Sequence, residues 1–240
     1  MRLKCSFKTD MLPVSYNMLF ISLIKESLKR VDKEYFNNLF YFNEKSNKKS
    51  KNYSFAVRLD KFRLKDECFI IDGNVSLILT SPDIEFFINF YNGLLGIDEF
   101  NYKEFNLKRE KIYLLKEKQI NNSEVIFKTL SPICVKDKMG KYLDIDDKRF
   151  NEEINYIANV TLRNFRGEAL KRELNFEPLN MQKVVVKVDD HFFEKGNKYY
   201  GVNSYKGVFK LTGDMEDLNL LYQLGLSFRR NQGFGMLEVV

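Results

Sequence analysis

The last sixteen residues, Gly225-Leu-Ser-Phe-Arg-Arg-Asn-Gln-Gly-Phe-Gly-Met-Leu-Glu-Val-Val240, form a glycine-rich loop that leads into a short apolar strand. Glycine adopts positive φ and lets a backbone approach a ligand, and such loops expose main-chain N–H groups as an anion-binding concavity. Arg229 and Arg230 add planar donors that suit phosphate. The stretch predicts a cradle for a phosphate backbone; the alternative is an ordinary turn with solvated arginines. It matches neither a Walker loop, which needs Gly-Lys-Ser/Thr, nor a dinucleotide-binding fingerprint, because a strand follows the glycines.

The composition is that of a globular protein with a modest positive charge. The 240 residues suffice for one large or two small domains, and 44% of them are hydrophobic. Lys plus Arg number 39 and Asp plus Glu 33, and the net charge of +6 favours an anionic partner. Cys5, Cys68 and Cys134 form no CxxC pair, so we expect core residues and neither a metal site nor disulfides. We expect no cofactor.

The chain carries no sign of a membrane or secretory segment. Its N-terminus lacks the apolar core of a signal peptide, and no apolar run nears the roughly 18 residues of a membrane helix. The sequence therefore predicts a soluble, cytoplasmic protein with no membrane partner.

The first half of the chain alternates between strand and helix patterns. Residues 2–8 alternate with period two, which puts Leu3, Cys5 and Phe7 on one face of a strand. Further on, apolar residues recur at helical spacing, and Asp72-Gly73-Asn74 predicts a hairpin turn between its flanking strands. The expected elements are a strand at 2–8, a helix after Pro13, strands at 53–59, 68–72 and 75–80, a helix after Ser81 and Pro82, and an extended segment at 100–117.

The second half repeats this order after a polar stretch at residues 119–123. Its expected elements are a strand at 125–130, a helix opened by Asp146 and Asp147, strands at 182–188 and 205–213, a short helix capped by Asp214, and the last strand. Both halves then follow the order β-α-β-β-α-β of a ferredoxin-like domain, the first half with an extra hairpin. The sequence predicts an α+β protein of two tandem ferredoxin-like, RRM-like domains at 1–119 and 124–240, the second ending with the glycine-rich loop.

Five short stretches, spread over nearly the whole chain, form a more specific pattern. They are Leu12-Pro-Val-Ser-Tyr16, Tyr53-Ser-Phe-Ala-Val57, Leu130-Ser-Pro-Ile-Cys-Val-Lys136, Gly207-Val-Phe-Lys-Leu-Thr-Gly213, and Leu224-Gly-Leu226 with Gly233-Phe-Gly-Met-Leu-Glu238. Together they resemble the CRISPR-associated endoribonucleases that cut repeat RNA (Cas6, in the RAMP superfamily). The glycine-rich ending is the most specific of the five.

The resemblance implies two ferredoxin-like domains, a glycine-rich loop beside the RNA, and a cleavage reaction that needs no metal. The ribose 2′-hydroxyl attacks the adjacent phosphate and leaves a 2′,3′-cyclic phosphate and a 5′-hydroxyl, so that guide crRNA is cut from its precursor. A base must take the 2′-hydroxyl proton, an acid must protonate the leaving oxygen, and cations must stabilise the phosphorane. The RNA supplies the nucleophile, which restricts cleavage to RNA.

The chain departs from the family pattern after its first helix. Many members carry a histidine there, whereas residues 38–44 hold none, and the one histidine, His191, lies in an expected turn. By matching to relatives without the histidine, Lys25 and Lys51 are expected to stabilise the phosphorane, with Tyr41 transferring protons. A lysine near pKa 10.4 is a poor base unless its pKa is lowered. Without the histidine we expect slow cleavage, by a factor of about 10²–10⁴ if one acid–base group is missing.

The resemblance also implies an RNA-binding surface on the glycine-rich loop and the polar loop at 43–52. The polar loop holds four lysines and is either a solvated connector or a phosphate contact. The residues expected to bind RNA are Gly225, Arg229, Arg230, Asn231, Gly233, Phe234, Gly235, Lys48 and Lys49. The expected partner is CRISPR repeat RNA in its precursor, with interference-complex subunits and a second copy of the chain as further partners.

Three other functions fit the same residues. A catalytically inactive relative would bind repeat RNA without cutting it, and the missing histidine favours this alternative. Another ferredoxin-like subunit of a CRISPR effector complex would coat guide RNA, although the Gly233-Phe-Gly235 ending argues against it. A protein-binding module with a basic loop would show salt-insensitive or no RNA binding, because phosphate contacts weaken with salt.

Overall fold

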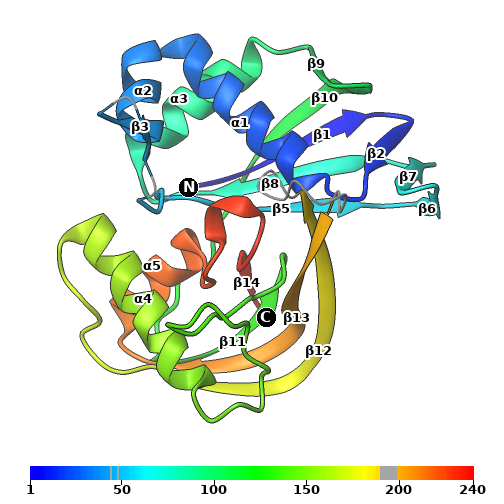
Figure 1. Cartoon of the computed structure of the whole chain (residues 1–240). Coiled ribbons are helices and arrows are strands. Elements are labelled where there is room, and N and C mark those ends of the chain that lie inside the picture. The colour runs from blue at the N-terminus through cyan, green and yellow to red at the C-terminus, as the bar shows by residue number, and fades with distance from the viewer. Residues whose placement is uncertain (44, 48, 190–198) are drawn as a thin grey trace.

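The computed structural model describes residues 1–43, 45–47, 49–189 and 199–240, and its two lobes each contain a sheet covered by helices (Figure 1). The first lobe consists of β1 (Arg2–Lys8), β2 (Met11–Pro13), α1 (Asn17–Val31), α2 (Lys33–Phe40), β3 (Tyr41–Phe42), β4 (Lys45–Ser46), β5 (Ser54–Leu59), β6 (Phe62–Lys65), β7 (Cys68–Ile71), β8 (Val75–Thr80), α3 (Ile84–Leu95), β9 (Glu99–Tyr102) and β10 (Phe105–Leu115). The second lobe consists of β11 (Glu124–Thr129), α4 (Phe150–Arg166), β12 (Asn175–Asp189), β13 (Tyr199–Thr212), α5 (Met215–Leu224), a 3₁₀ turn (Arg230–Gln232) and β14 (Leu237–Val239).

The two main sheets have the same antiparallel strand order. The first runs β5-β8-β1-β10-β9 and the second β12-β13-β11-β14. Without the edge strand β9, each sheet orders its four strands as second, third, first and fourth along the chain. This is the arrangement of a ferredoxin-like β-α-β-β-α-β unit, so the predicted pair of tandem ferredoxin-like folds is confirmed.

Each sheet buries one face under its helices. In β1 the side chains of Leu3, Cys5 and Phe7 are at most 1% exposed, as their alternation predicts. Helices α1 and α3 cover this face, and they approach closely at Gly93, where an added Cβ would lie 1.8 Å from the backbone oxygen of Ser27. In the second lobe α4 and α5 pack in the same way over the core that contains Phe127, Phe209 and Tyr222.

The predicted hairpin between residues 68–72 and 75–80 is wrong. Strand β7 pairs with β2 and β6 in a separate three-stranded sheet, whereas β8 pairs with β1 and β5. The Asp72–Asn74 turn is closed from the other side, because Asp72 donates to the Lys61 oxygen and Asn74 accepts from Asp60 (both 3.0 Å). Residues Asp72–Asn74 do form a turn, but this turn connects β7 to β8. The short hairpin β6–β7 is thereby inserted between β5 and β8, which pair with each other.

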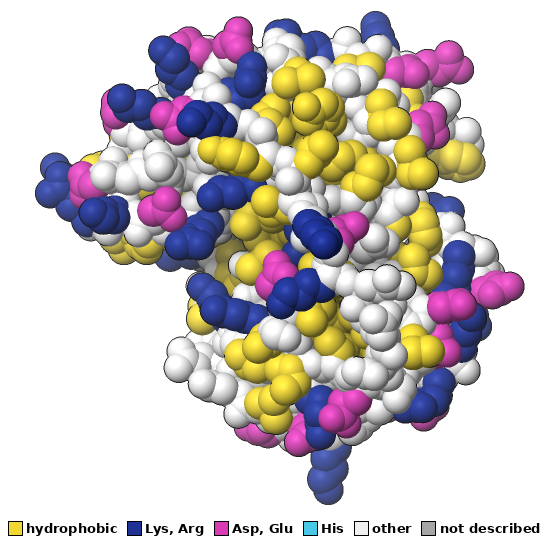
Figure 2. Space-filling model, turned by 180° about the vertical axis from the view of Figure 1, so that it is seen from behind, with side chains coloured by type: hydrophobic (Ala, Val, Ile, Leu, Met, Phe, Trp, Pro, Cys, Tyr) yellow, Lys and Arg dark blue, Asp and Glu magenta, His cyan; other side chains and the backbone are white. Residues whose placement is uncertain are grey.

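The second face of the first sheet is buried against the second lobe. Arg2 is 3% exposed, and its guanidinium donates to Glu238 Oε2 (2.7 Å) and to the backbone oxygen of Leu237 (2.8 Å). The same guanidinium lies 4.3 Å from the ring centroid of Tyr222. Seen from behind, the lobes are separated by a waist along which Lys and Arg side chains gather (Figure 2). Residues 1–3 and 237–239 thus join the two ends of the chain.

Within the described residues, none of the helices combines the length and the apolar character that crossing a membrane requires.

Candidate functional site

Lys25 and Lys51 lie over the same aromatic ring, although 26 positions separate them in the chain. Lys25 is an exposed residue of α1, and Lys51 precedes β5 and is 8% exposed. The Lys25 Nζ lies 5.1 Å and the Lys51 Nζ 5.6 Å from the ring centroid of Phe40, the last residue of α2. The π face of a phenylalanine attracts cations, so Phe40 helps to hold two like charges close together.

Burial and neighbouring charges change the proton affinity of Lys51. Burial, and then the positive charges of Lys25 and Lys49, lower the pKa of Lys51 from 10.5 to about 8. Its Nζ donates to the backbone oxygens of Asn47 (2.6 Å) and Lys49 (2.5 Å). These carbonyls hold two amine hydrogens, which leaves one position on the nitrogen to gain or lose a proton. At pH 7 about a tenth of such amines are neutral.

Tyr41 directly follows Phe40, whose ring lies under the two lysines. It is the C-cap of α2, it is 49% exposed, and its ring centroid lies 6.0 Å from that of Phe36. Within the described residues its hydroxyl has no hydrogen-bond partner. The structure therefore brings all three predicted catalytic residues to the end of α2.

A cavity of about 250 Å³ opens beside Lys51, between the polar loop and the second lobe. Most of its lining is amide, hydroxyl or amine: Asn38, Leu39, Asn47, Lys49, Ser50, Lys51, Asn52 and, from α4, Asn164. Such a set of neutral donors and acceptors with a cationic wall suits a polar anionic ligand.

The glycines of the glycine-rich loop lie against the protein's own chain. Gly225, Gly233 and Gly235 have φ of 81°, 81° and 68°, and all three are buried. A Cβ on Gly233 would lie 2.9 Å from the Asn17 side-chain nitrogen, and one on Gly235 would lie 2.5 Å from the Leu226 oxygen. Close packing of protein on protein explains these glycines, and their role as phosphate ligands stays a prediction.

Arg230 and Phe234 also point into the protein. Arg230 is 3% exposed, and its guanidinium donates to the Leu224 oxygen (2.6 Å) and to Ser50 Oγ (2.7 Å). Burial lowers the pKa of this guanidinium to about 10. Phe234 is fully buried in a small cluster with Cys134 and other side chains. In this conformation neither side chain is open to a ligand, so RNA binding by them also stays a prediction.

The Asn231 side chain forms hydrogen bonds with the segment that carries Lys51. Its Nδ2 donates to the backbone oxygens of Lys51 (3.0 Å) and Tyr53 (2.6 Å). Its Oδ1 accepts from the backbone nitrogen of Lys51 (2.7 Å) and from Ser50 Oγ (3.2 Å). One side chain of the second lobe thus makes four hydrogen bonds to three consecutive or near-consecutive residues of the first.

The remaining predicted residues are placed differently. Arg229 is half-buried on the opposite side of the loop, where its Nε donates to the Tyr142 hydroxyl (2.8 Å). Lys49 is exposed beside Lys51. Lys48 and His191 lie outside the described residues.

Three residues of the site, Phe40, Asn47 and Ser50, could not be predicted from the sequence. Phe40 lies within residues 38–44, and nothing in its spacing from Lys25 or Lys51 shows that both amines meet its ring. Asn47 and Ser50 belong to the polar loop, whose polarity predicts exposure and not hydrogen bonds to buried groups. The sequence feature that could have indicated Asn47 and Ser50 is that each lies between lysines of the polar loop.

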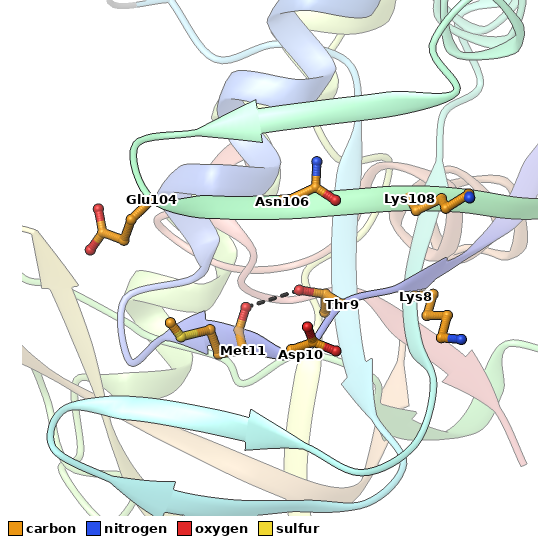
Figure 3. A pocket seen from close by; sticks show the side chains of 7 residues that line it. All are labelled: Lys8, Thr9, Asp10, Met11, Glu104, Asn106 and Lys108. Carbon is orange, nitrogen blue, oxygen red and sulfur yellow. Dashed lines mark hydrogen bonds between the residues drawn. The ribbon is translucent and has the colours of Figure 1, made fainter.

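A second cavity, of about 430 Å³, contains none of the predicted site residues (Figure 3). It is lined by Lys8, Thr9, Asp10, Met11, Glu104, Asn106 and Lys108. Lys8 and Lys108 are direct partners in the β1–β10 pairing, and the Thr9 hydroxyl donates to the Met11 oxygen (3.0 Å). Its two lysines and two carboxylates favour neither sign of charge, so the cavity beside Lys51 is the stronger candidate site for an anionic ligand.

No described group of three or more His, Cys, Asp and Glu side chains is arranged to hold a metal ion.

Two tandem ferredoxin-like folds, closed by a glycine-rich loop and a short last strand, place the chain in the class of tandem ferredoxin-like proteins. The family described as "CRISPR associated protein Cas6, C-terminal" matches residues 115–239, more than half of the chain. The chain belongs to the Cas6 family.

Relatives with this architecture align over almost the whole chain. A CRISPR-associated endoribonuclease Cas6 of Methanocaldococcus jannaschii is 24% identical over 251 residues, which cover 99% of this chain and 92% of the relative. Among solved structures, a Cas6-related protein from Pyrococcus furiosus superposes with a TM-score of 0.82 at 20% identity, covering 100% of this chain and 98% of the other. A RAMP protein that binds different RNA substrates superposes with a TM-score of 0.80 at 21% identity, covering 100% and 99%.

Proposed function

We propose that this chain is an endoribonuclease that cuts CRISPR repeat RNA in the precursor transcript and releases guide crRNA. The observation that carries the proposal is the pair of amines over Phe40, one of them with a pKa lowered to about 8, beside a polar cavity. Membership of the Cas6 family supports the substrate. In this proposal residues 1–119 and 124–240 are the two domains, and the cavity lies between them.

The residue types fit cleavage by the ribose 2′-hydroxyl. Neutral Lys51 takes the 2′-hydroxyl proton, the oxygen attacks the adjacent phosphorus, and the bond from phosphorus to the 5′ oxygen breaks. Tyr41 donates its proton to that leaving oxygen, and Lys25 stabilises the negative charge of the phosphorane. The products are a 2′,3′-cyclic phosphate and a 5′-hydroxyl, and no step needs a metal ion.

This assignment changes the role expected for Lys51. At an ordinary pKa near 10.4 a lysine would supply only charge. A pKa of about 8 lies close to physiological pH, where a group is most effective as a general base. Lys51 thereby takes over the proton transfer that a histidine performs in many relatives, with a smaller active fraction at pH 7.

The test uses the protein's own repeat RNA and a copy with a 2′-deoxyribose at the cut, both in EDTA. We expect cleavage of the first RNA only, with cyclic phosphate ends. Cleavage of the deoxy copy, or cleavage that requires added Mg²⁺, would contradict the mechanism. Tight binding without cleavage would identify the chain as an inactive carrier of repeat RNA, the second candidate, which the absence of a histidine at residues 38–44 favours.

The other partners stay predictions. Interference-complex subunits would receive the cut RNA, and a homodimer would place two sites on one assembly. A cytoplasmic location follows from this function, because the precursor transcript is made there.

A further inference from the structure

The segment around the 3₁₀ turn has two faces with different surroundings. Arg230 and Asn231 point to the first lobe and hold the Lys51 segment. Phe228 and Arg229 point the other way, over the second lobe. Phe228 is 49% exposed, although its backbone is fixed by a hydrogen bond from its nitrogen to the Cys134 oxygen (3.0 Å).

On this outer face aromatic rings and cations alternate. The Lys136 Nζ lies 5.4 Å from the ring centroid of Phe228 and 5.6 Å from that of Tyr142. The Arg229 guanidinium carbon lies 5.3 Å from the ring centroid of Tyr200, and its Nε donates to the Tyr142 hydroxyl (2.8 Å). We call these five residues, Phe228, Lys136, Tyr142, Arg229 and Tyr200, the aromatic–cation row.

The row is built from separate parts of the second lobe. Lys136 and Tyr142 face each other across an isolated β-bridge between β11 and α4, and Tyr200 belongs to β13. Arg229 is further fixed by a hydrogen bond from its Nη1 to the Gln232 side chain (2.6 Å). The rings and cations are thus held in place by the fold.

Neither cation of the row has a carboxylate partner in the part of the chain that the structure describes. The neighbouring acid, Asp137, is already bound: its Oδ2 accepts from Arg149 (3.1 Å) and its Oδ1 from the backbone nitrogens of Met139 and Lys141. The row therefore keeps two positive charges beside an exposed ring. An anionic partner with flat apolar faces would pair with the two cations and stack on the ring.

We propose that the aromatic–cation row binds an unpaired segment of RNA, with a base stacked on Phe228 and phosphates against Lys136 and Arg229. Single strands are recognised by basic grooves with stacking aromatic side chains, whereas a duplex hides its base faces. An acidic peptide would pair with the cations but would leave the Phe228 ring unused. This role of the row rests on the proposed function. It places an unpaired part of the RNA substrate on the second lobe, while Lys51 of the first lobe performs the cleavage.

The test measures binding without cleavage. A fluorescein-labelled single-stranded RNA, and the same strand in a duplex, are titrated against the wild-type protein and the variants Phe228→Ala, Phe228→Tyr and Lys136→Ala. Stacking of one base is worth a factor of roughly five to 150, and we expect Phe228→Ala to weaken single-strand binding by this range. Phe228→Tyr keeps a ring and should bind as the wild type does. Lys136→Ala should lower the salt dependence, the slope of log K against log salt, by about 0.7.

A matched control is Phe62→Ala, because Phe62 is an equally exposed phenylalanine (51%) on the first lobe. Equal single-strand affinity of Phe228→Ala and the wild type would overturn the proposal, as would equal losses for Phe228→Ala and Phe62→Ala, or a loss that is as large for the duplex. Wild-type protein that binds single strands through Phe228 but cuts nothing would refute the proposed nuclease and leave the row standing. Wild-type protein that cuts, with Phe228→Ala unchanged in affinity, would refute the row alone.

Discussion

Two partly buried cations, Lys51 of the first lobe and Arg166 of the second, occupy similar folds and have opposite surroundings. Arg166, the last residue of α4, donates to the fully buried carboxylate of Asp217 (2.6 Å) and to the Ala169 oxygen (2.6 Å). Lys51 has two backbone oxygens and a second amine nearby, and the described residues offer it no carboxylate. A buried cation that is paired with a carboxylate stabilises the fold. A buried cation that has no carboxylate partner keeps its charge and its proton available for a substrate.

The largest effect is expected from removing the unpaired amine. Lys51→Ala should lower the rate of repeat-RNA cleavage by about 10²–10⁴ and leave the affinity for a 2′-deoxy RNA nearly unchanged, because a general base contributes that much. Single-turnover cleavage assays measure the rate. Lys29→Ala, an exposed lysine of the same lobe, is the matched control. Full activity of the double variant Lys25→Ala/Lys51→Ala would refute the site.

Removing the paired cation should affect folding instead. Arg166→Ala leaves the buried Asp217 carboxylate with the backbone nitrogen of Lys171 (2.7 Å) as its remaining partner. Loss of one member of a buried pair should lower the free energy of unfolding by about 3 kcal/mol. Urea denaturation followed by circular dichroism measures this change. Below the transition the cleavage rate should equal that of the wild type, and a rate loss in fully folded Arg166→Ala would break the comparison.

The pH dependence separates the two possible roles of Lys51. Because its pKa is lowered to about 8, the neutral fraction of the Lys51 amine rises with pH, reaches one half near pH 8 and approaches its maximum about one pH unit higher. If Lys51 is the base, kcat/KM should rise about tenfold per pH unit between pH 6 and 7.5 and level off above 8, since this parameter reports the free enzyme. A profile that is flat and then falls above pH 8 would mean that Lys51 acts through its positive charge. Lys51→Arg should abolish the rise.

The sequence allowed the fold to be predicted further than the site. Alternation in residues 2–8 and helical spacing after Pro13 reflect burial directly, so patterns of this kind predict the order of strands and helices along the chain. The hairpin error at Asp72–Asn74 arose because turn residues mark where a chain reverses but not which strand it then pairs with. Pairing is decided by non-local contacts, here the burial of β8 between β1 and β5.

The structure places Lys25 and Lys51 over one ring, Phe40, with Tyr41 next to that ring in the chain, while their catalytic roles stay predictions. The sequence could not show which contacts hold these side chains. The meeting of both amines on Phe40 depends on how α1, α2 and the polar loop pack. From the sequence, arginines in a glycine-rich loop are expected to contact phosphate. In the structure the Arg230 guanidinium instead donates hydrogen bonds to Ser50 and to a backbone oxygen. Whether a polar side chain faces solvent or the protein is a property of tertiary structure.

The smallest predicted effect tests whether the second lobe sets the geometry of Lys51. Asn231→Ala removes four hydrogen bonds to residues 50–53, so the Lys51 amine should lose its fixed position while RNA affinity is kept. A catalytic group that is displaced but present costs less than one that is absent, and we expect kcat to fall about tenfold, near the worth of one or two hydrogen bonds. The control is Asn92→Ala, an exposed asparagine of α3 that is not among the residues lining the cavity. A fall in RNA affinity with unchanged kcat would mean that Asn231 contacts RNA directly. A fall in kcat with unchanged RNA affinity would mean that the glycine-rich loop acts by positioning Lys51.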